Sequence, residues 1–373
     1  MRVALLTYDD TDPADPDPHV TADPRPFLPD ADWTRVELEK PTAASTLVRL
    51  VQEGCDLFFN LCDGGWDGEA PGIEVVAALE RLDVPFTGAD TRFYDPSREA
   101  MKRVCAAAGI AFPRYVLARD AAGVEAAADT LAFPLIVKPP AGYSSIGVTR
   151  ESRVGTPAAL RDRAAGTIRE RGAALIEEFI EGGEATVLVS EDPDDDGPVA
   201  YTPIRYRFPP GESFKHYRLK WHDYHSLDAA PVDDPALDAA LREDAVRVFT
   251  GLAGSGYGRC DFRIDRDGRP VLLEINPNCG IYYPESDPGS ADLCLLHDPA
   301  GHAGFTDRIV RAAFRRHRAR QRGWEVRQTA DGFGLFATRR FEPGDIVVRY
   351  ENEPHTLVTR STVRAAWAET DRA

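Results

Sequence analysis

Short hydrophobic runs alternate with stretches of helical periodicity over the first part of the chain. The apolar runs Val3–Thr7 and Leu57–Asn60 have the length of buried strands, and turns rich in proline, aspartate or glycine follow them. Apolar positions between Pro71 and Leu82 recur with a helical spacing, and Val84–Gly88 predicts a return to the sheet. Strands in alternation with helices are typical of an open α/β domain, which we predict over residues 1–90.

The next region combines helices with strands. Residues Pro96–Ala108 predict a helix, because proline stands at its start and Gly109 is placed to end it. Strands are expected at Pro134–Lys138, Ala174–Glu178 and Thr186–Val189. We therefore predict a compact α+β unit over residues 91–190.

A β-hairpin is predicted within a third region, residues 191–318. Side chains of a strand switch faces at every residue, so Arg259 and Asp261 share one face. Asp267-Gly268 has the composition of a tight hairpin turn. The densest acidic run of the chain, which begins at Glu191, is typical of a solvated turn, and we assign it no function.

The second strand of this hairpin carries a candidate metal site. Glu274 and Asn276 share one face, and we expect Leu273 and Ile275 to point to the core. Two adjacent strands would therefore bring Asp261 next to Glu274 and Asn276. Magnesium prefers oxygen ligands, so this cluster predicts a site for a cation bound to phosphates. The alternative is a set of solvated hairpin residues.

A candidate phosphate site precedes it in the chain. Lys138 ends a predicted strand, and the glycine-serine loop Gly142–Gly147 follows it. Within this loop Ser144, Ser145 and Gly147 are small enough to let backbone amides approach phosphate oxygens. The alternative is an ordinary flexible connection, but Lys138 on the preceding strand favours the phosphate site.

Two further segments complete a nucleotide site. Glu177 offers a carboxylate near an adenine edge, Phe179 and Ile180 an apolar surface for the ring, and Glu184 a carboxylate for ribose hydroxyls. The alternative is a strand edge with surface acids. The cationic and aromatic stretch from residue 215 to residue 225 could close over a triphosphate, with Lys220 as the contact to the γ-phosphate. A basic surface loop, or a metal site made by His216, His222 and His225, are the alternatives to that role.

Length, charge and cysteine content narrow the class of protein. A chain of 373 residues exceeds the roughly 250 to 300 residues of a single core, so we expect two or three domains. The net charge of -17 argues against a nucleic-acid partner. The chain has no apolar run long enough to span a membrane, and its start is too short and too soon polar for a secretory signal, which predicts a cytoplasmic protein. The six cysteines lack C-x-x-C spacing, so we expect reduced thiols.

Taken in order, these motifs resemble the ATP-grasp superfamily, and most closely the D-alanine–D-alanine ligases. The likeness spans residues 1 to about 315. Its carriers are Phe-Pro-Leu-Ile-Val-Lys-Pro at 133–139 with Ser144-Ser145-Ile146-Gly147, Glu-Glu-Phe-Ile-Glu-Gly-Gly-Glu at 177–184, Gly-Tyr-Gly-Arg-Cys-Asp at 256–261 and Leu-Glu-Ile-Asn-Pro-Asn at 273–278. The resemblance implies an α/β and α+β chain with the three-region ATP-grasp fold, divided at residues 90 and 190.

The resemblance also implies the roles of individual residues. The catalytic residues would be Arg259, Lys220 and Ser144. The nucleotide would be bound by Lys102, Lys138, Ser145, Gly147, Glu177, Phe179, Ile180 and Glu184. Two magnesium ions, with manganese as an alternative, would be held by Asp261, Glu274 and Asn276.

The reaction that the resemblance implies is the ATP-dependent joining of a carboxylate to an amine through an acyl phosphate. The partners would be small molecules resembling amino acids or peptides, and the protein would be a homodimer. The segment after the first strand, Tyr8–Pro13, differs from the glycine-rich turn and glutamate that hold an amino group in the D-alanine–D-alanine ligases. D-alanine ligation is therefore retained as an alternative to ligation of other substrates.

The C-terminal tail gives a separate signal. Residues Asp331–Thr338 and Phe341–Val348 resemble the opening of a SET methyltransferase domain, which binds S-adenosylmethionine partly through this glycine turn. The later motifs of that domain are missing before residue 373. We therefore expect a small β-rich extension over residues 324–373. The alternative is a regulatory ATP-binding body whose tail engages a partner or a methyl donor.

Overall fold

The computed structural model describes residues 1–9, 22–65, 68–140, 147–194, 197–216, 219, 227–322, 324–329 and 332–337. The chain divides into two compact units, Met1–Arg318 and Ala319–Ala373. The first unit contains three β-sheets, and the second contains a two-stranded sheet.

The N-terminal sheet has three parallel strands. Its strands are β1 (Arg2–Thr7), β2 (Asp32–Glu37) and β3 (Leu57–Asn60), in the order β2-β1-β3. The helices α1 (Ala43–Gln52) and α2 (Ile73–Arg81) pack on one face, and a short 3-10 helix η1 (Arg25–Phe27) precedes β2. The predicted β1, β3 and α2 are confirmed, but β2 and α1 were not predicted. The segment expected to restart the sheet at Val84–Gly88 forms a single parallel bridge, between Phe58 and Phe86.

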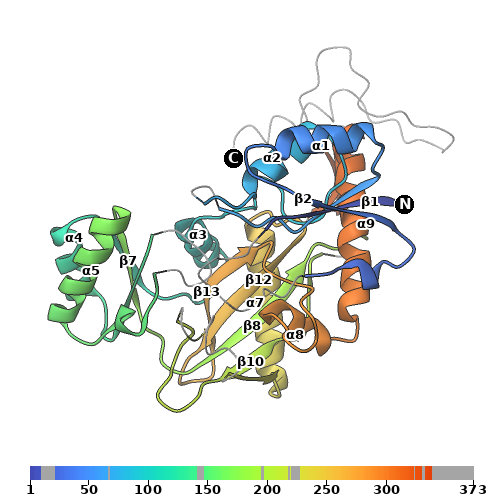
Figure 1. Ribbon diagram of the computed structural model, residues 1–373. Coiled ribbons are helices and arrows are strands. Elements are labelled where there is room, and N and C mark those ends of the chain that lie inside the picture. Colours follow the sequence, from blue (N-terminus) through green and yellow to red (C-terminus); the bar gives the residue numbers. More distant parts are fainter. Residues whose placement is uncertain are drawn as a thin grey trace, which may run out of the picture. The chain divides into compact units, whose positions relative to one another are not determined.

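A second, antiparallel sheet has four strands in the order β4-β7-β5-β6. These are β4 (Tyr115–Ala118), β5 (Leu135–Lys138), β6 (Arg153–Val154) and β7 (Ala174–Glu178), with a short 3-10 helix η2 (Arg150–Ser152) before β6. The helices α4 (Ala121–Thr130) and α5 (Pro157–Arg171) lie side by side against this sheet (Figure 1). Their apolar residues form one small core with those of the strands.

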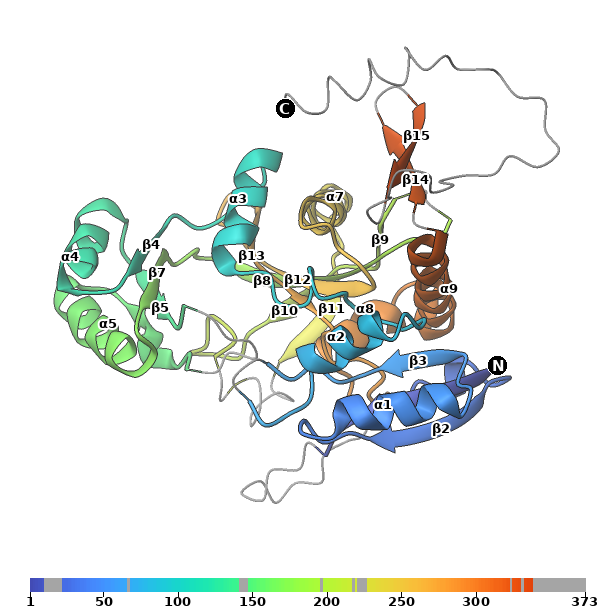
Figure 2. The same ribbon diagram turned by 90° about the horizontal axis from the view of Figure 1, so that it is seen from above.

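The largest sheet has six strands in the order β11-β10-β8-β12-β13, with β9 paired to β8. The strands are β8 (Gly183–Ser190), β9 (Val199–Ala200), β10 (Ile204–Arg207), β11 (Asp228–Pro231), β12 (Tyr257–Ile264) and β13 (Pro270–Pro277). Helices α3 (Arg98–Ala108) and α7 (Pro235–Gly251) cover one face of this sheet (Figure 2). Helix α8 (Ser290–Leu296) packs on β8 from the opposite face, and the long helix α9 (Gly301–Arg322) follows it.

The predicted helix before Gly109 is confirmed, but it begins at Arg98 rather than at Pro96. Ser97 caps α3 by accepting a hydrogen bond from the amide of Ala100 at 3.1 Å. Gly109 ends the helix in the left-handed conformation, with φ of 67°.

Strand β8 belongs to the six-stranded sheet rather than to the four-stranded one. It pairs with β12 along its whole length, whereas β7 pairs with β4 and β5. We therefore propose that the boundary predicted at residue 190 lies between Glu178 and Gly183. We likewise propose that α3 belongs with the six-stranded sheet, because it packs on α7 and β13.

The predicted hairpin forms, with one difference in register. Arg259 lies opposite Asn276 and Asp261 opposite Glu274, but Phe262 pairs with Leu272. This β-bulge leaves Leu273 without a partner in the ladder, so its side chain is partly exposed while Leu272 and Ile275 are buried. The expectation that Leu273 points to the core was therefore wrong.

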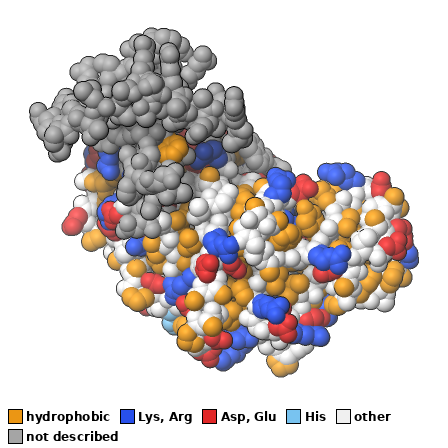
Figure 3. Space-filling model, turned by 180° about the vertical axis from the view of Figure 1, so that it is seen from behind, with side chains coloured by type: hydrophobic (Ala, Val, Ile, Leu, Met, Phe, Trp, Pro, Cys, Tyr) orange, Lys and Arg blue, Asp and Glu red, His pale blue; other side chains and the backbone are white. Residues whose placement is uncertain are grey.

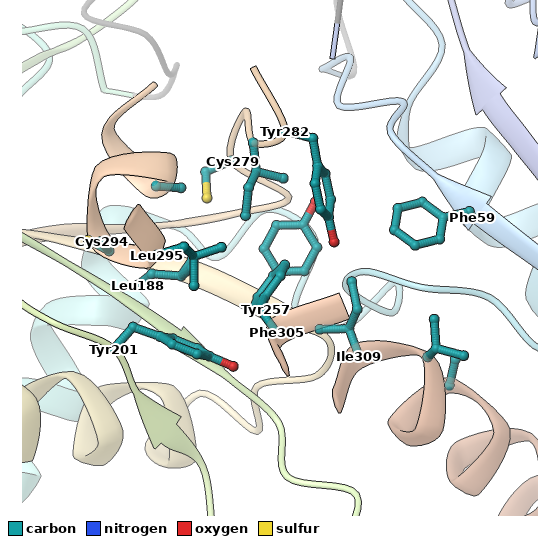
Figure 4. Packing of buried hydrophobic residues seen from close by; sticks show 14 of the residues in the cluster. Phe59, Leu188, Tyr201, Tyr257, Cys279, Tyr282, Cys294, Leu295, Phe305 and Ile309 are labelled. Atoms are coloured by element: carbon teal, nitrogen blue, oxygen red, sulfur yellow. The ribbon is translucent and has the colours of Figure 1, made fainter. Parts of the chain in front are cut away.

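A hydrophobic core joins the N-terminal sheet to the six-stranded sheet. Figure 4 shows Phe59 of β3 facing Tyr282, with Tyr257 of β12 and Phe305 of α9 below them. The rings of Phe59 and Tyr282 are 5.7 Å apart in an edge-to-face arrangement. This packing fixes the segment after β13 against the carboxyl-terminal half of β3.

The acidic run that begins at Glu191 is not a solvated turn at its first residue. Glu191 is buried and pairs with Arg315, at 2.9 Å, and with Arg316. Burial would raise the pKa of Glu191, but the two guanidinium groups outweigh it and lower the pKa. Arg316 also donates to the carbonyls of Phe86 and Gly88, so this carboxylate ties β8, α9 and the end of the N-terminal region together.

Positive and negative side chains are interspersed over the face shown in Figure 3. In the described part of the chain, no helix combines the length and the hydropathy needed to cross a bilayer.

All six cysteines lie in described segments and remain free thiols, as expected.

In the second unit, strands β14 (Trp324–Thr329) and β15 (Gly332–Ala337) pair as an antiparallel hairpin. The remainder of the predicted SET-like segment lies outside the described residues.

Candidate active site

One cavity brings together residues of the four-stranded and six-stranded sheets. Of the predicted site residues it is lined by Lys138, Glu177, Phe179, Ile180, Glu184, Arg259, Asp261 and Glu274. They come from β5, β7, the turn after β7, and the strands β8, β12 and β13. Segments separated by more than a hundred residues thus face a common space.

Two lysines share one buried carboxylate at this cavity. The ammonium of Lys138 lies 2.7 Å from one oxygen of Glu177, and that of Lys102 lies 2.5 Å from the other. Burial would raise the pKa of Glu177, but the two ammonium groups lower it to about 2. Glu177 is therefore ionised and holds Lys138 at the cavity wall. Lys102 is 3% exposed and lies behind Glu177, with its charge 4.8 Å from the ring centre of Tyr115.

An apolar wall continues from this ion cluster. It consists of Ile136, Val148, Phe179 and Phe214, which pack together as a separate small core. All four side chains line the cavity, and the rings of Phe179 and Phe214 are 5.6 Å apart. Such a surface suits a flat aromatic ligand such as adenine.

Glu184 is held in place by a buried arginine. Nη1 of Arg263 donates to Glu184 at 3.0 Å, and the same guanidinium donates to the carbonyls of Ile180, Gly182 and Ser213. The backbone amide of Lys215 also donates to Glu184, at 3.3 Å. The carboxylate is thus fixed at the edge of the apolar wall.

The predicted oxygen cluster forms around Asp261. Arg259 donates to both oxygens of Asp261, from Nε at 2.9 Å and from Nη2 at 2.8 Å. Asn276 donates to Asp261 at 3.0 Å, and the Thr186 hydroxyl donates to it at 2.8 Å. Burial would raise the pKa of Asp261, but Arg259 outweighs it and lowers the pKa to about 2.

Glu274 lies across the hairpin from Asp261 and pairs with a different arginine. Nη2 of Arg98 donates to Glu274 at 3.2 Å. Nη1 of the same arginine donates to the carbonyl of Pro139 at 3.1 Å, directly after β5. Arg98 therefore connects the two sheets at the cavity.

These donors fit a hard divalent cation. Asp261, Glu274 and Asn276 supply carboxylate and amide oxygens from two neighbouring strands. In the absence of a metal ion, guanidinium groups balance the charge of both carboxylates. Among the described residues, no group of three His, Cys, Asp or Glu side chains is arranged as a metal site.

Several predicted residues contribute differently or lie elsewhere. Ser144, Ser145 and Lys220 are outside the described residues, as are His222 and His225. Gly147 is described and adopts φ of 78°, with its carbonyl accepting from Arg163 at 2.8 Å. His216 is buried and bonded to Glu212 at 2.9 Å.

Sequence reasoning did not identify Arg98, Arg263 or Phe214. Arg98 stands one helical turn before Lys102, so the i, i+4 rule could have found it. Arg263 continues the alternation of Arg259 and Asp261 along β12. For Phe214 the sequence offers no comparable signal, because its contact with Phe179 joins segments distant in the chain.

Comparisons with known proteins identify the family of this chain. A family model described as D-ala D-ala ligase C-terminus matches residues 104–283. The D-alanine–D-alanine ligase of Laribacter hongkongensis is 33% identical over 281 residues, covering 71% of this chain and 84% of the relative. D-alanine–D-alanine ligase B of Xanthomonas campestris pv. campestris is 34% identical over 247 residues, covering 62% of this chain and 71% of the relative.

Solved structures show the same fold. The D-alanine–D-alanine ligase of Coxiella burnetii superposes with a TM-score of 0.60 at 16% identity, covering 86% of this chain and 96% of that one. The VanG D-Ala:D-Ser ligase of Enterococcus faecalis gives a TM-score of 0.61 at 16% identity, covering 84% and 99%. Together with the sequence matches, these likenesses show that the chain belongs to the D-alanine–D-alanine ligase family of ATP-grasp enzymes, ligases that use ATP and a divalent metal ion to join a carboxylate to an amine.

Proposed function

We propose that the cavity binds ATP and that the chain transfers the γ-phosphoryl group to the carboxylate of an amino-acid-like substrate. The observation that carries this proposal is the convergence of three features on one cavity. Its wall is apolar, Lys138 and Arg259 supply positive charge, and Asp261 and Glu274 supply metal ligands beside Asn276.

The reaction consists of two displacements. A carboxylate oxygen of the first substrate attacks the γ-phosphorus, and ADP leaves with the electron pair of the broken P–O bond. The uncharged amine of the second substrate then attacks the acyl carbon of the acyl phosphate. Phosphate leaves, and the nitrogen loses a proton to give the amide. Negative charge moves between oxygens throughout, so fixed cations and amides stabilise both transition states.

The position of each residue in the cavity suggests which part of ATP or metal it would bind. Lys138 and Arg98 would bind phosphate oxygens, Phe179 and Ile180 would contact adenine, and Glu184 the ribose. Asp261, Glu274 and Asn276 would hold two magnesium ions, which neutralise phosphate charge when bound. Arg259 would stabilise the transferred phosphoryl group. Lys220 would contact the γ-phosphate, Ser144 would take part in catalysis and Ser145 would bind the nucleotide. Lys102 would act by fixing Glu177.

The substrates are proposed as a class. Both relatives named above are D-alanine–D-alanine ligases, and VanG is a D-Ala:D-Ser ligase, which supports small amino acids. D-alanine itself remains the alternative to other amino acids or short peptides. The net charge of -17 supports a protein without a nucleic-acid partner, and we propose a cytoplasmic enzyme that acts as a homodimer.

The test is ADP release from the purified protein with ATP and magnesium, against pooled L- and D-amino acids and short peptides. Mass spectrometry of the products should show a mass equal to two substrates minus water. Lys138→Ala and Glu274→Ala should each abolish this release, because each removes a charge that faces the triphosphate. The exposed Glu243→Ala on α7 is the matched control and should retain it. Full turnover in both site variants would refute the proposal.

We also propose a role for the tail. Residues 331–348 resemble the opening of a SET domain, and we propose that they belong to a docking or regulatory extension. Binding of S-adenosylmethionine to the full chain, measured by calorimetry, would support the methyl-donor alternative.

A further inference from the structure

The loop after β10 forms part of the cavity proposed to bind nucleotide. Phe214 and Lys215 of this loop both line the cavity. The carbonyl of Ser213 accepts from Arg263 at 2.7 Å, and the backbone amide of Lys215 donates to Glu184 at 3.3 Å. The placement of these three loop residues therefore decides where the aromatic wall stands and how the carboxylate proposed for ribose is fixed.

A single carboxylate at the start of this segment joins it to the four-stranded sheet. The side chain of Glu212 is 9% exposed, and its Oε1 pairs with the guanidinium of Arg150. Arg150 begins η2, the short helix that leads into β6. Two residues before Arg150, Val148 lines the cavity and packs with Phe179 and Phe214. The ion pair thus connects a loop of the six-stranded sheet to a segment that carries another part of the apolar wall.

The second oxygen of Glu212 fixes the other end of the loop segment. It bonds to Nε2 of His216 at 2.9 Å, and the side chain of His216 is 2% exposed. Nδ1 of the same ring accepts from the backbone amide of Leu219 at 3.3 Å, so Nε2 carries the proton and donates to the carboxylate. Burial would raise the pKa of Glu212, but Arg150 and His216 outweigh it and lower the pKa. Glu212 is therefore ionised and brackets residues 213–215.

The apolar wall of the cavity depends on both sheets staying together. Ile136 lies in β5 and Val148 precedes β6, whereas Phe214 belongs to the loop after β10. A flat ring bound by this wall needs its parts at a fixed separation, because packing contacts weaken steeply with distance. Arg150 is 60% exposed, so its pair with Glu212 contributes little to the free energy of unfolding, and its effect falls on this separation.

We propose that Glu212 is a positioning residue for the nucleotide: by joining Arg150 to His216, it holds the loop after β10 against the segment before β6 and so keeps the apolar wall assembled. This inference rests on the nucleotide binding proposed above. It assigns a part in that binding to a pair of charges on two different sheets, which act through Phe214 and Lys215 rather than by touching ATP.

The experiment uses the full chain with magnesium. Calorimetry gives the Kd of a non-hydrolysable ATP analogue, and ADP release with the amino-acid pool gives KM for ATP and kcat. Glu212→Gln keeps the shape of the side chain and removes its charge, Arg150→Gln removes the partner, and the double variant removes both. Arg161→Gln is the matched control, because Arg161 pairs with Glu125 between the exposed surfaces of α5 and α4, within the unit of the four-stranded sheet.

Glu212→Gln and Arg150→Gln should each raise the Kd of the analogue and KM for ATP by about 3- to 10-fold, the worth of a partly buried charged hydrogen bond. They should leave kcat within about twofold, because neither residue is placed at the reacting atoms. The double variant should bind no more weakly than either single variant, since both remove the same connection. Arg161→Gln should leave the Kd unchanged.

An unchanged Kd in Glu212→Gln, or single effects that multiply in the double variant, would overturn the inference while leaving the proposed function intact. An equal rise of Kd in Arg161→Gln would also overturn it, since a general loosening of the four-stranded sheet would then suffice. Absence of analogue binding by the wild type would refute the proposed function itself, and the inference with it.

Discussion

Glu177 shows how one buried residue can govern a charged site. Its carboxylate balances two lysines, and it is 1% exposed. Removing one member of a buried ion cluster leaves charges without compensation, which costs more than the cluster contributes when intact.

We therefore predict that Glu177→Gln lowers the free energy of unfolding by about 3 kcal/mol at neutral pH, measured by urea denaturation. Glu125→Gln is the control, because Glu125 makes a bidentate pair with Arg161 on the exposed surface of α4 and α5 and should have no measurable effect. Equal losses in the two variants would contradict the role of burial.

The same residue predicts a pH dependence. The pKa of Glu177 is lowered to about 2 in the folded protein, so its ionised form stabilises the fold at any pH above the unfolded pKa. This contribution is lost as the pH falls through the folded value. Stability differences between wild type and Glu177→Gln should be constant above about pH 5 and should narrow toward about pH 2. A difference that grows on acidification would contradict this assignment.

At the scale of elements, one close junction lies between the loop before α3 and the start of β12. Gly256 has φ of 63°, and a Cβ there would lie 2.2 Å from the carbonyl carbon of Gly88. Gly109, at the end of α3, has a similar φ of 67°, but its nearest neighbour is a flexible arginine tip at 4.0 Å. A substitution at Gly109 therefore tests backbone strain alone, whereas a substitution at Gly256 tests backbone strain together with a steric clash.

Gly109→Ala should cost about 1 kcal/mol in the free energy of unfolding, the usual cost of a left-handed alanine. Gly256→Ala should cost about 3 kcal/mol or more, because the backbone of Gly88 must move as well. Chemical denaturation of both variants provides the comparison. A loss at Gly256 no larger than that at Gly109 would show that the junction yields easily.

The elements also show what the sequence could predict. Local signals sufficed for α3, for β5 and for the hairpin of β12 and β13, where alternation correctly joined Asp261 to Asn276. Pairing between distant segments was not predictable, so β2 was missed and the pairing of β8 with β12 was not foreseen. The bulge opposite Asp261 exposed Leu273 for the same reason, since a register shift leaves no mark on alternation.

The whole molecule consists of two units, and the described residues that line the cavity lie between Arg98 and Ser290. We predict that a chain ending at Arg322, which retains α9, keeps ADP release within about twofold of the full chain. Activity assays and unfolding midpoints of the two chains test this. Loss of turnover with unchanged folding would instead give the tail a direct part in the reaction.

At this scale the sequence predicted the residues that would bind nucleotide and metal, but not the residues that hold them in place. The family motifs pointed to Lys138, Glu274 and their neighbours, because each stands in a short local pattern. The place of Phe214 depends on its contact with Phe179, a residue distant in the chain. Such contacts become visible when the sheets are assembled.

The paired arginines at the cavity have a consequence for how ligands arrive. Asp261 and Glu274 already hold Arg259 and Arg98, so a metal ion must compete with a guanidinium at each carboxylate. A bare cation gains little from this exchange, whereas a cation that comes with a triphosphate brings new anionic partners for the released arginines. We therefore expect metal and nucleotide to enter as one complex. In the ligand-free enzyme the two arginines act as the counter-ions of the two carboxylates, and this pairing discriminates against free divalent ions.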